Sequence, residues 1–316
     1  SSNREFEDNA EHGLGMLLGH EAVRDRLVGK LEAMAANDKT PAETKDLIAA
    51  YLDTMADGEA NAKAVEALVP ALEAAAENGC PEAPEILQNK EYLNKKSVWI
   101  FGGDGWAYDI GYGGLDHVIA SKQDVNIFVF DTEVYSNTGG QASKASNIGQ
   151  VAQFAAAGKE VKKKSLAEIA MQYGYVYVAQ VAMGADQAQT LKAIREAEAY
   201  DGPSLIIAYA PCINHGIKGG MGQTQLQQKR AVDAGYWNLY HFDPRRKTQG
   251  ENPFVLDSGR PEGDFEEFLM SEVRFASLKK KDPELAEQMY NQADREARER
   301  YERYAELARK TEKNTG

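Results

Sequence analysis

Four short apolar runs, separated by helical patterns, constrain the fold of this chain more than any other feature. They cover residues 97–101, 125–130, 175–181 and 204–210. Each run is rich in β-branched and aromatic residues and nearly continuous, which is typical of parallel strands buried on both faces. Helical patterns lie between them, near residues 109–120, 166–173 and 186–199. This succession predicts an α/β fold, with a parallel twisted sheet and helices on both of its faces.

The segments that flank this core are predicted to be mainly helical. Residues 1–96 form a predicted helical N-terminal segment, because apolar side chains such as Leu27 and Leu31 recur at helical spacing. Residues 97–242 form the predicted α/β core, which includes a further strand near its end. Residues 243–316 are predicted to be a polar loop and then a helical arm, whose apolar stripe docks on a neighbouring surface.

Composition argues against several classes of protein. The formal net charge of −13 disfavours broad binding to nucleic acid or to anionic membranes. Lys162–Lys164 is the obvious candidate for a local basic patch, although we favour a solvated loop as its interpretation. No apolar run approaches the length of a membrane-spanning helix, and no signal-peptide pattern opens the chain. The cytoplasm is therefore the expected compartment. A start at Ser1 rather than Met suggests processing or a piece of something longer.

Cysteine and histidine usage offers few metal ligands. The two cysteines, Cys80 and Cys212, exclude a disulfide framework and a complete four-cysteine site within this chain. Cys80 lies in a predicted loop, whereas Cys212 follows the last apolar run and is by default a buried, inert thiol. The five histidines form no cluster with metal-binding spacing, and only His215 lies beside a candidate site.

Polar residues follow two of the predicted strands directly, where ligands bind in open α/β folds. Asp104 lies on a glycine-rich turn after the first run, and Thr132 follows the second. Glycine backbone can approach a diphosphate closely, and Mg²⁺ prefers hard oxygen ligands such as a carboxylate, a hydroxyl and a backbone carbonyl. The pattern predicts a metal–diphosphate site. The compositions of Gly103–Gly105 and Ser136–Gln141 are also typical of ordinary surface turns, so this alternative stays open for both segments.

Several long motifs stand out, namely Val98–His117, Asp131–Lys144, Phe154–Lys159, Tyr173–Tyr177, Cys212–Gly216 and Tyr236–Trp237, and they are extended by Phe6–Met16 and Glu266–Met270. Together these motifs resemble the thiamine-diphosphate-binding domain at the C-terminal end of pyruvate:ferredoxin (flavodoxin) oxidoreductases. The resemblance implies the fold of thiamine-diphosphate-binding domains. It also implies oxidative decarboxylation of pyruvate to acetyl-CoA and CO₂, with electrons passing through iron–sulfur clusters to ferredoxin or flavodoxin.

The resemblance also implies roles for individual residues. It places Mg²⁺ on Asp104, the Thr132 side chain and the Val134 carbonyl, and it assigns a substrate-facing catalytic role to Asn137. Cys212 matches one of four ligands to a [4Fe–4S] cluster, whose other three cysteines lie upstream in the family. The implied cofactor-binding residues are Gly103, Asp104, Gly105, Trp106, Thr132, Glu133, Val134, Tyr135, Ser136 and Asn137.

The implied partners follow from the same resemblance. They are the remaining domains or chain of the oxidoreductase, pyruvate, coenzyme A and an electron-accepting ferredoxin or flavodoxin, with a homodimer as the complete enzyme. We expect this chain to be one part of that enzyme and to be inactive alone. Two alternatives remain, namely a subunit of another thiamine-dependent 2-oxoacid enzyme and a non-catalytic assembly fragment.

Overall fold

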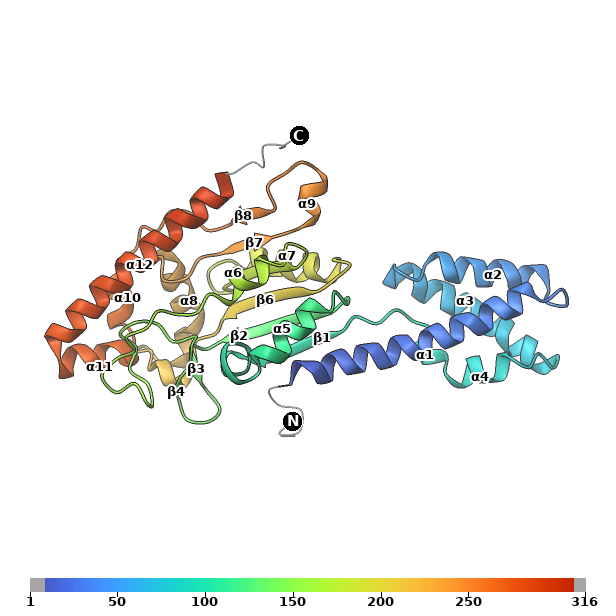
Figure 1. Ribbon diagram of the computed structural model, residues 1–316, viewed down its shortest axis with the longest axis horizontal. Coiled ribbons are helices and arrows are strands. Elements are labelled where there is room, and N and C mark those ends of the chain that lie inside the picture. Colours follow the sequence, from blue (N-terminus) through green and yellow to red (C-terminus); the bar gives the residue numbers. More distant parts are fainter. Residues whose placement is uncertain (1–8, 310–316) are drawn as a thin grey trace. The chain divides into compact units, whose positions relative to one another are not determined.

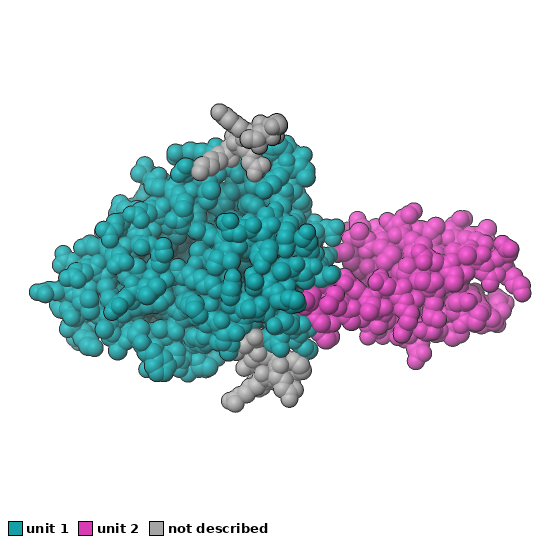
Figure 2. Space-filling view, in the orientation of Figure 1, with its two compact units in different colours: residues 1–12, 99–316 teal, residues 13–98 magenta. Residues whose placement is uncertain are grey.

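The computed structural model describes residues 9–309 and divides the chain into two compact units. One unit comprises residues 13–98, and the other comprises residues 1–12 together with 99–316 (Figure 2). The first part of the Phe6–Met16 motif lies outside the described residues. Within the described part of the chain, every helix is too short or too polar to cross a membrane.

The smaller unit is built from helices with an apolar core of their own. Its helices are α1 (Ala10–Ala36), α2 (Ala42–Asp53), α3 (Gly58–Glu77) and α4 (Ala83–Gln88), with α1 beginning in the larger unit. Leu27, Leu31 and Leu68 are completely buried in this core. The Asp57 carboxylate caps α3 by accepting hydrogen bonds from two backbone N–H groups, because the first turn of a helix leaves such groups without partners.

The larger unit contains the predicted sheet, which runs in the order β1-β2-β6-β5-β7-β8 (Figure 1). The strands are β1 (Trp99–Gly103), β2 (Asn126–Asp131), β5 (Tyr177–Val181), β6 (Ser204–Tyr209), β7 (Tyr240–Phe242) and β8 (Phe254–Leu256). The first four in sheet order are parallel, as predicted, whereas β7 and β8 add in the antiparallel direction. The fold class is confirmed as a mixed α/β fold with a mostly parallel sheet.

Helices connect successive strands of the sheet, and the last of them leads into antiparallel strand β7. They are α5 (Tyr112–Ala120), α6 (Leu166–Met171), α7 (Gln187–Glu198) and α8 (Thr224–Asp233). A π-helical turn, Gly105–Ile110, lies between β1 and α5. Such turns are rare and recur at functional sites. The segment predicted as one helix near residues 109–120 is therefore two elements, and the first of them follows Asp104 directly.

Burial differs along the sheet. Central strand β6 is buried almost throughout, as its continuous apolar run predicts. On β1 and β2, however, Phe101 is 60% exposed and Phe130 is 44% exposed. The prediction that these two runs are buried on both faces is wrong at these positions, where the rings of Phe101 and Phe130 stack on each other while they remain exposed.

The region after β7 is more ordered than its polar composition indicates. It holds α9 (Arg245–Thr248), strand β8, α10 (Phe265–Met270), α11 (Val273–Lys281) and α12 (Pro283–Arg309). The helix predicted over 283–309 is confirmed, and it packs on the sheet's antiparallel edge through Tyr304, whose ring lies 4.9 Å from that of Tyr240. The predicted loop is wrong because short elements here are stabilised by packing rather than by local propensity.

The carboxyl ends of β1, β2 and β6 gather the candidate residues at one edge of the sheet. Asp104 follows β1, and Asp131 is the last residue of β2. A small hairpin of β3 (Val134–Tyr135) and β4 (Gln141–Ala142) comes next in the chain. The segment after β6 leads through Cys212 into a 3₁₀ turn at Ile213–His215. This edge is where open parallel sheets bind ligands.

Candidate functional site

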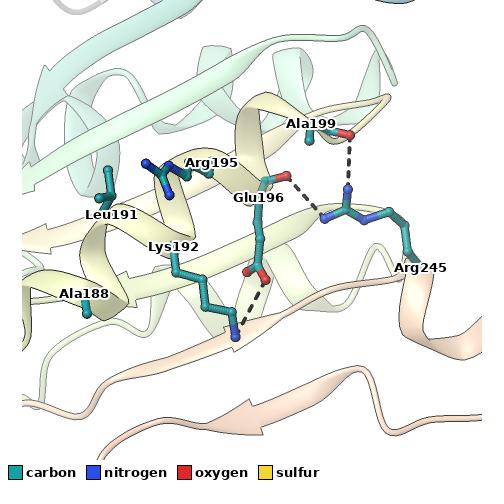
Figure 3. A pocket seen from close by; sticks show the side chains of 7 residues that line it. All are labelled: Ala188, Leu191, Lys192, Arg195, Glu196, Ala199 and Arg245. Atoms are coloured by element: carbon teal, nitrogen blue, oxygen red, sulfur yellow. Dashed lines mark hydrogen bonds and ion pairs between the residues drawn. The ribbon is translucent and has the colours of Figure 1, made fainter.

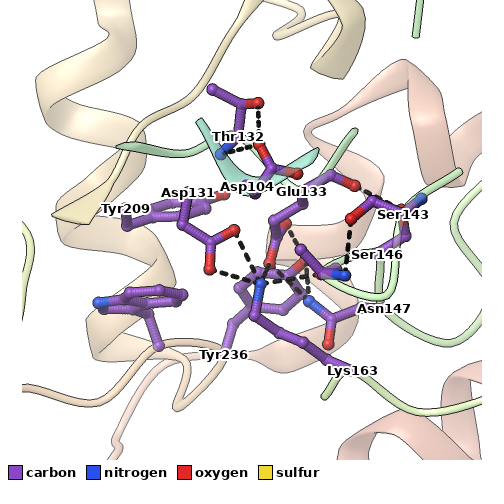
Figure 4. Close-up of polar contacts among 12 residues, drawn as sticks. Asp104, Asp131, Thr132, Glu133, Ser143, Ser146, Asn147, Lys163, Tyr209 and Tyr236 are labelled. Atoms are coloured by element: carbon purple, nitrogen blue, oxygen red, sulfur yellow. Dashed lines mark hydrogen bonds and ion pairs between the residues drawn. The ribbon is translucent and has the colours of Figure 1, made fainter. Parts of the chain in front are cut away.

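Asp104, Thr132 and Val134 meet at the sheet edge and present three oxygen atoms to one another (Figure 4 shows the first two). The Thr132 hydroxyl lies 2.7 Å from Oδ1 of Asp104 and 3.0 Å from the Val134 carbonyl oxygen. The Thr132 backbone N–H also donates to Oδ1 of Asp104, at 3.2 Å. A carboxylate, a hydroxyl and a carbonyl are the hard ligands that Mg²⁺ accepts.

The Asp104 carboxyl group is in an environment that suits a cation. The residue is 1% exposed, and its Oδ2 atom has no hydrogen-bond partner. Burial, reinforced by the nearby Asp131 carboxylate, raises the pKa of Asp104 to about 7. An unpaired buried carboxylate oxygen costs free energy, which a metal ion bound beside it would offset. The residues therefore fit Mg²⁺.

The glycines around Asp104 serve two different purposes. A Cβ atom on Gly102 would lie 2.1 Å from the Trp106 ring, and one on Gly105 would lie 2.5 Å from the Tyr135 ring. Those two glycines are required by packing against aromatic side chains. A Cβ atom on Gly103 would meet nothing within 4 Å. Gly103 is thus the glycine of this turn whose exposed backbone a ligand can approach closely.

Asp131 and Lys163 form a buried ion pair beside Asp104. Lys163 Nζ lies 2.7 Å from Oδ2 of Asp131, and the Tyr108 hydroxyl donates to the same oxygen. Burial raises the pKa of Asp131, and the Lys163 charge opposes this effect. The interpretation of Lys162–Lys164 as a solvated loop is therefore wrong for Lys163, whose side chain is only 14% exposed.

Glu133 lies between the two candidate metal ligands in sequence, yet its side chain is completely buried. Its Oε2 atom accepts from the Tyr236 hydroxyl at 2.6 Å and pairs with the Arg274 guanidinium at 2.5 Å. Its Oε1 atom accepts from the Asn147 amide at 2.7 Å. Burial raises the pKa of Glu133, but Arg274 and Lys163 outweigh burial and hold that pKa at about 2. The side chain is thus ionised and fully engaged within the protein.

Arg274 joins this cluster to a second carboxylate and a histidine. Its Nε atom donates to Oε2 of Glu272 at 2.6 Å, and Nη2 donates to the Tyr209 hydroxyl at 3.1 Å. His215 Nε2 lies 2.7 Å from the Thr132 carbonyl oxygen, and Nδ1 lies 3.8 Å from Glu272. Burial and the Arg274 charge lower the pKa of His215 to about 3, so the ring is neutral and Nε2–H donates to Thr132.

At this edge of the sheet, buried carboxyl groups outnumber the cationic side chains that pair with them. Four carboxyl groups are buried here, those of Asp104, Asp131, Glu133 and Glu272. Lys163 and Arg274 form ion pairs with three of them, Asp131, Glu133 and Glu272. Excess buried negative charge is expensive at low dielectric, and a divalent cation at Asp104 would relieve it. Between residues 9 and 309 no group of three or more His, Cys, Asp or Glu side chains is arranged to hold a metal. A site built on Asp104 therefore depends on hydroxyl and carbonyl oxygens.

The remaining predicted residues lie in the turn after β1 and in the β3–β4 hairpin. Gly105 and Trp106 open the π-helical turn, where the Trp106 ring is buried. Tyr135 and Ser136 are half-buried in the β3–β4 hairpin, and Asn137 is exposed at its turn.

Cys212 lies on the neighbouring segment and is half-buried with a free thiol. That segment lies against the hairpin, because a Cβ atom on Gly140 would come within 2.8 Å of the Asn214 amide oxygen. The hairpin and the Cys212 segment are thus neighbours at the sheet edge.

The larger unit has two further cavities, one away from this cluster and one beside it. One, of about 390 Å³, is lined by α7 and Arg245, whose guanidinium donates to the Ala199 and Glu196 carbonyls (Figure 3). The other, of about 780 Å³, lies between residues 159–165 and α12. Arg303 bonds Glu168 there, Lys162 lies 3.9 Å from Glu296, and Lys164 donates to the Tyr108 carbonyl.

Comparisons with known proteins show what this chain is similar to. Residues 85–208 match the family model described as "Thiamine pyrophosphate enzyme, C-terminal TPP binding domain". The chain is 52% identical to a pyruvate-flavodoxin oxidoreductase of Klebsiella pneumoniae over 307 residues, which cover 97% of this chain and 26% of that protein. It is 50% identical to the pyruvate:ferredoxin oxidoreductase of Moorella thermoacetica, over 96% of this chain and 26% of that protein.

This chain is homologous to one part of the pyruvate:flavodoxin and pyruvate:ferredoxin oxidoreductases. It spans about a quarter of the length of these relatives. A mitochondrial "Pyruvate dehydrogenase [NADP(+)]" of Euglena gracilis is also similar, at 44% identity over 96% of this chain and 17% of that protein. The family resemblance seen in the sequence motifs is thereby confirmed, and the matched model supports thiamine diphosphate as the cofactor.

Sequence reasoning missed much of the buried cluster. Asp131 was visible as the acid that ends a buried strand, and Lys163 as the middle of a lysine run. Glu272 and Arg274 carried no local signal, because they lie about 140 residues from Glu133 and only folding joins them. The linear pattern of oxygen-bearing residues after two strands therefore reveals the outer half of the site, whereas its inner half depends on tertiary structure.

Replacing Lys163 tests whether the buried ion pair stabilises the sheet edge. Lys163→Met should lower the free energy of unfolding by about 3–5 kcal/mol, because it leaves Asp131 buried without its cation. Lys162→Met is the matched control, with an expected change within about 0.5 kcal/mol for an exposed side chain. Urea denaturation of both variants measures the difference. Equal stability of the two would contradict the assigned role of Lys163.

Proposed function

We propose that this chain binds the Mg²⁺ and diphosphate of thiamine diphosphate within a pyruvate oxidoreductase. The observation that carries the proposal is the meeting of three oxygen ligands, from Asp104, Thr132 and Val134, at a residue whose second carboxylate oxygen, Oδ2 of Asp104, is buried without a partner. The excess of buried carboxyl groups around Asp104 supports a divalent cation at the same place.

Each part of the edge has a proposed task in binding. The Asp104 carboxylate, the Thr132 hydroxyl and the Val134 carbonyl hold Mg²⁺. The exposed backbone at Gly103 approaches the diphosphate, while the packed rings of Trp106 and Tyr135 keep the turn in shape. Thiamine diphosphate, when bound, supplies the chemistry that cleaves the carbon–carbon bond of a 2-oxoacid. The protein supplies position and a dry, charged surrounding for the cofactor.

Pyruvate is the proposed substrate because several relatives carry pyruvate in their names. Those names differ in electron acceptor, which is flavodoxin, ferredoxin or NADP⁺. Since this segment is similar in all three, we infer that it serves the pyruvate half-reaction and that other parts of the enzyme select the acceptor. Coenzyme A as acetyl acceptor and the homodimer follow from the family resemblance. The cytoplasm remains our proposed compartment, consistent with two unpaired cysteines.

We also propose that Cys212 ligates an iron–sulfur cluster that passes electrons away from the thiamine site. Its thiol is free and half-buried at the same sheet edge as Asp104. A cubane cluster is held by four thiolates, so this chain would supply one of them. The other three would come from the remaining part of the oxidoreductase.

Asp104→Asn tests the metal site. The substitution keeps the shape of the side chain but removes its charge, so affinity for thiamine diphosphate with Mg²⁺ should fall by more than about tenfold. Calorimetric titration of the 316-residue chain measures this affinity. Asp201→Asn, on an exposed loop, is the control and should bind as the unsubstituted chain does. Equal affinities in all three proteins would refute the assignment.

Asn137→Ala tests the proposed substrate contact. Because Asn137 is exposed on a turn, its loss should leave the melting temperature nearly unchanged. Pyruvate oxidation by the oxidoreductase that contains this chain should fall by about tenfold or more, since positioning contacts act on turnover. Thr138→Ala, on the same turn, is a control for loop shape. A lower melting temperature with unchanged pyruvate kinetics would identify Asn137 as a structural residue.

Cys212→Ser tests the cluster ligand in the same oxidoreductase. The variant should lose the visible absorption and the electron paramagnetic resonance signal of one cluster, because serine is a poor replacement for a thiolate. Thiamine diphosphate should stay bound, since Cys212 is not among its proposed ligands. Cys80→Ser, in the helical unit, is the matched control. An unchanged cluster content in Cys212→Ser would overturn the ligand role.

A further inference from the structure

Glu133 has a backbone conformation that L-residues rarely adopt. Its φ angle is +62°, in the left-handed region. Such a conformation costs about 1–2 kcal/mol for a residue with a side chain, and it persists only where the surroundings impose it. Glu133 lies between Thr132, whose hydroxyl contacts Asp104, and Val134, whose carbonyl accepts from the same hydroxyl.

The surroundings hold every acceptor atom of Glu133. Its backbone carbonyl accepts from the Ser146 hydroxyl at 2.5 Å. One carboxylate oxygen accepts from Asn147, and the other from Tyr236 and Arg274. Figure 4 shows the side chains of Ser146, Asn147 and Tyr236 around it. These contacts turn the Glu133 side chain into the protein, and two of the partners, Tyr236 and Arg274, are distant from it in the sequence.

The residue on the N-terminal side is fixed independently. The Thr132 carbonyl oxygen accepts a hydrogen bond from His215 Nε2, at 2.7 Å. His215 packs beside Glu272, which Arg274 also binds. The short segment 132–134 is thus held from two sides, and Arg274 contributes to both.

We propose that Glu133 and Arg274 are positioning residues, which hold the left-handed turn so that the Thr132 hydroxyl and the Val134 carbonyl face Asp104. This inference rests on the proposed function for its metal. The turn places the buried Glu133 side chain between the proposed ligands Thr132 and Val134. Glu133 therefore acts as an anchor, which fixes the separation of their oxygen atoms without contacting the metal itself.

Stability alone is a poor explanation for this ion pair. A buried ion pair must overcome the desolvation of both charges. Replacing both partners of such a pair by apolar residues often leaves stability unchanged or increases it. The pair is nevertheless 0–1% exposed and linked to hydroxyl, amide and carboxylate partners. A geometric role explains why charged groups occupy this position, since charge-assisted hydrogen bonds fix direction as well as distance.

Two tyrosines allow a matched test. Tyr236→Phe removes a buried hydroxyl that donates to Glu133 at 2.6 Å. Tyr304→Phe removes one that donates to Glu168 at 2.7 Å, away from the edge. Arg274→Lys is a third variant, because a single ammonium keeps the charge but loses the planar array of donors.

Three measurements on the 316-residue chain separate positioning from stability. They are the melting temperature, the backbone chemical shifts of residues 132–134, and the affinity for Mn²⁺ with thiamine diphosphate by electron paramagnetic resonance. Both phenylalanine variants should lower the melting temperature to a similar extent. Only Tyr236→Phe and Arg274→Lys should shift the resonances of residues 132–134 and weaken Mn²⁺ binding by about tenfold, the usual effect of losing a contact behind a metal ligand.

The outcomes distinguish the two ideas. If Tyr236→Phe, like Tyr304→Phe, changes neither the resonances of residues 132–134 nor the Mn²⁺ affinity, the positioning role is wrong. If the resonances move but the unsubstituted chain binds no Mn²⁺ with thiamine diphosphate, the anchor is real and the proposed metal site is wrong. If Arg274→Lys does not fold, the comparison of the two phenylalanine variants decides.

Discussion

Buried negative charge is the constraint on which the rest of the site depends. Four carboxyl groups lie at the carboxyl edge of the sheet, where water is excluded and each charge is costly. Arg274 and Lys163 make this arrangement possible by pairing with Glu133 and Asp131. Asp104 is left without a cation of its own, and its pKa is raised to about 7 by burial and by Asp131. The fold therefore concentrates its unbalanced charge at the place where two strand ends offer further oxygen atoms.

The surrounding glycines and aromatic rings explain how this edge keeps its shape. Gly102 and Gly105 allow the rings of Trp106 and Tyr135 to lie directly on the backbone of the turn. Interiors are packed so closely that even one methyl group there would displace a ring. Gly103, with open space at the corresponding position, is the part of the turn that remains accessible. One short glycine-rich segment thus combines rigid packing with an exposed backbone.

The predicted elements and the observed ones agree best where the sequence pattern is long and regular. The four parallel strands and the helix over 283–309 were predictable, because continuous apolar runs and helical stripes report burial directly. Helix α10 and strand β8 were not, because such short elements owe their order to packing. Phe101 and Phe130 were predicted to be buried but are exposed. An apolar run indicates that burial would be favourable, but it does not show that another element covers the run.

The sequence by itself determined the chemistry that the edge offers. A carboxylate after one strand and a hydroxyl after the next must meet if the strands are parallel neighbours, and the long motifs identify the related oxidoreductases. Only the tertiary structure decided how those groups are held. Glu133 owes its left-handed turn to Arg274, Tyr236 and Asn147, and no local pattern links these positions. The periodicity of a strand is a property of a few consecutive residues. The balance of buried charge depends instead on which side chains folding brings together in the same water-excluded region.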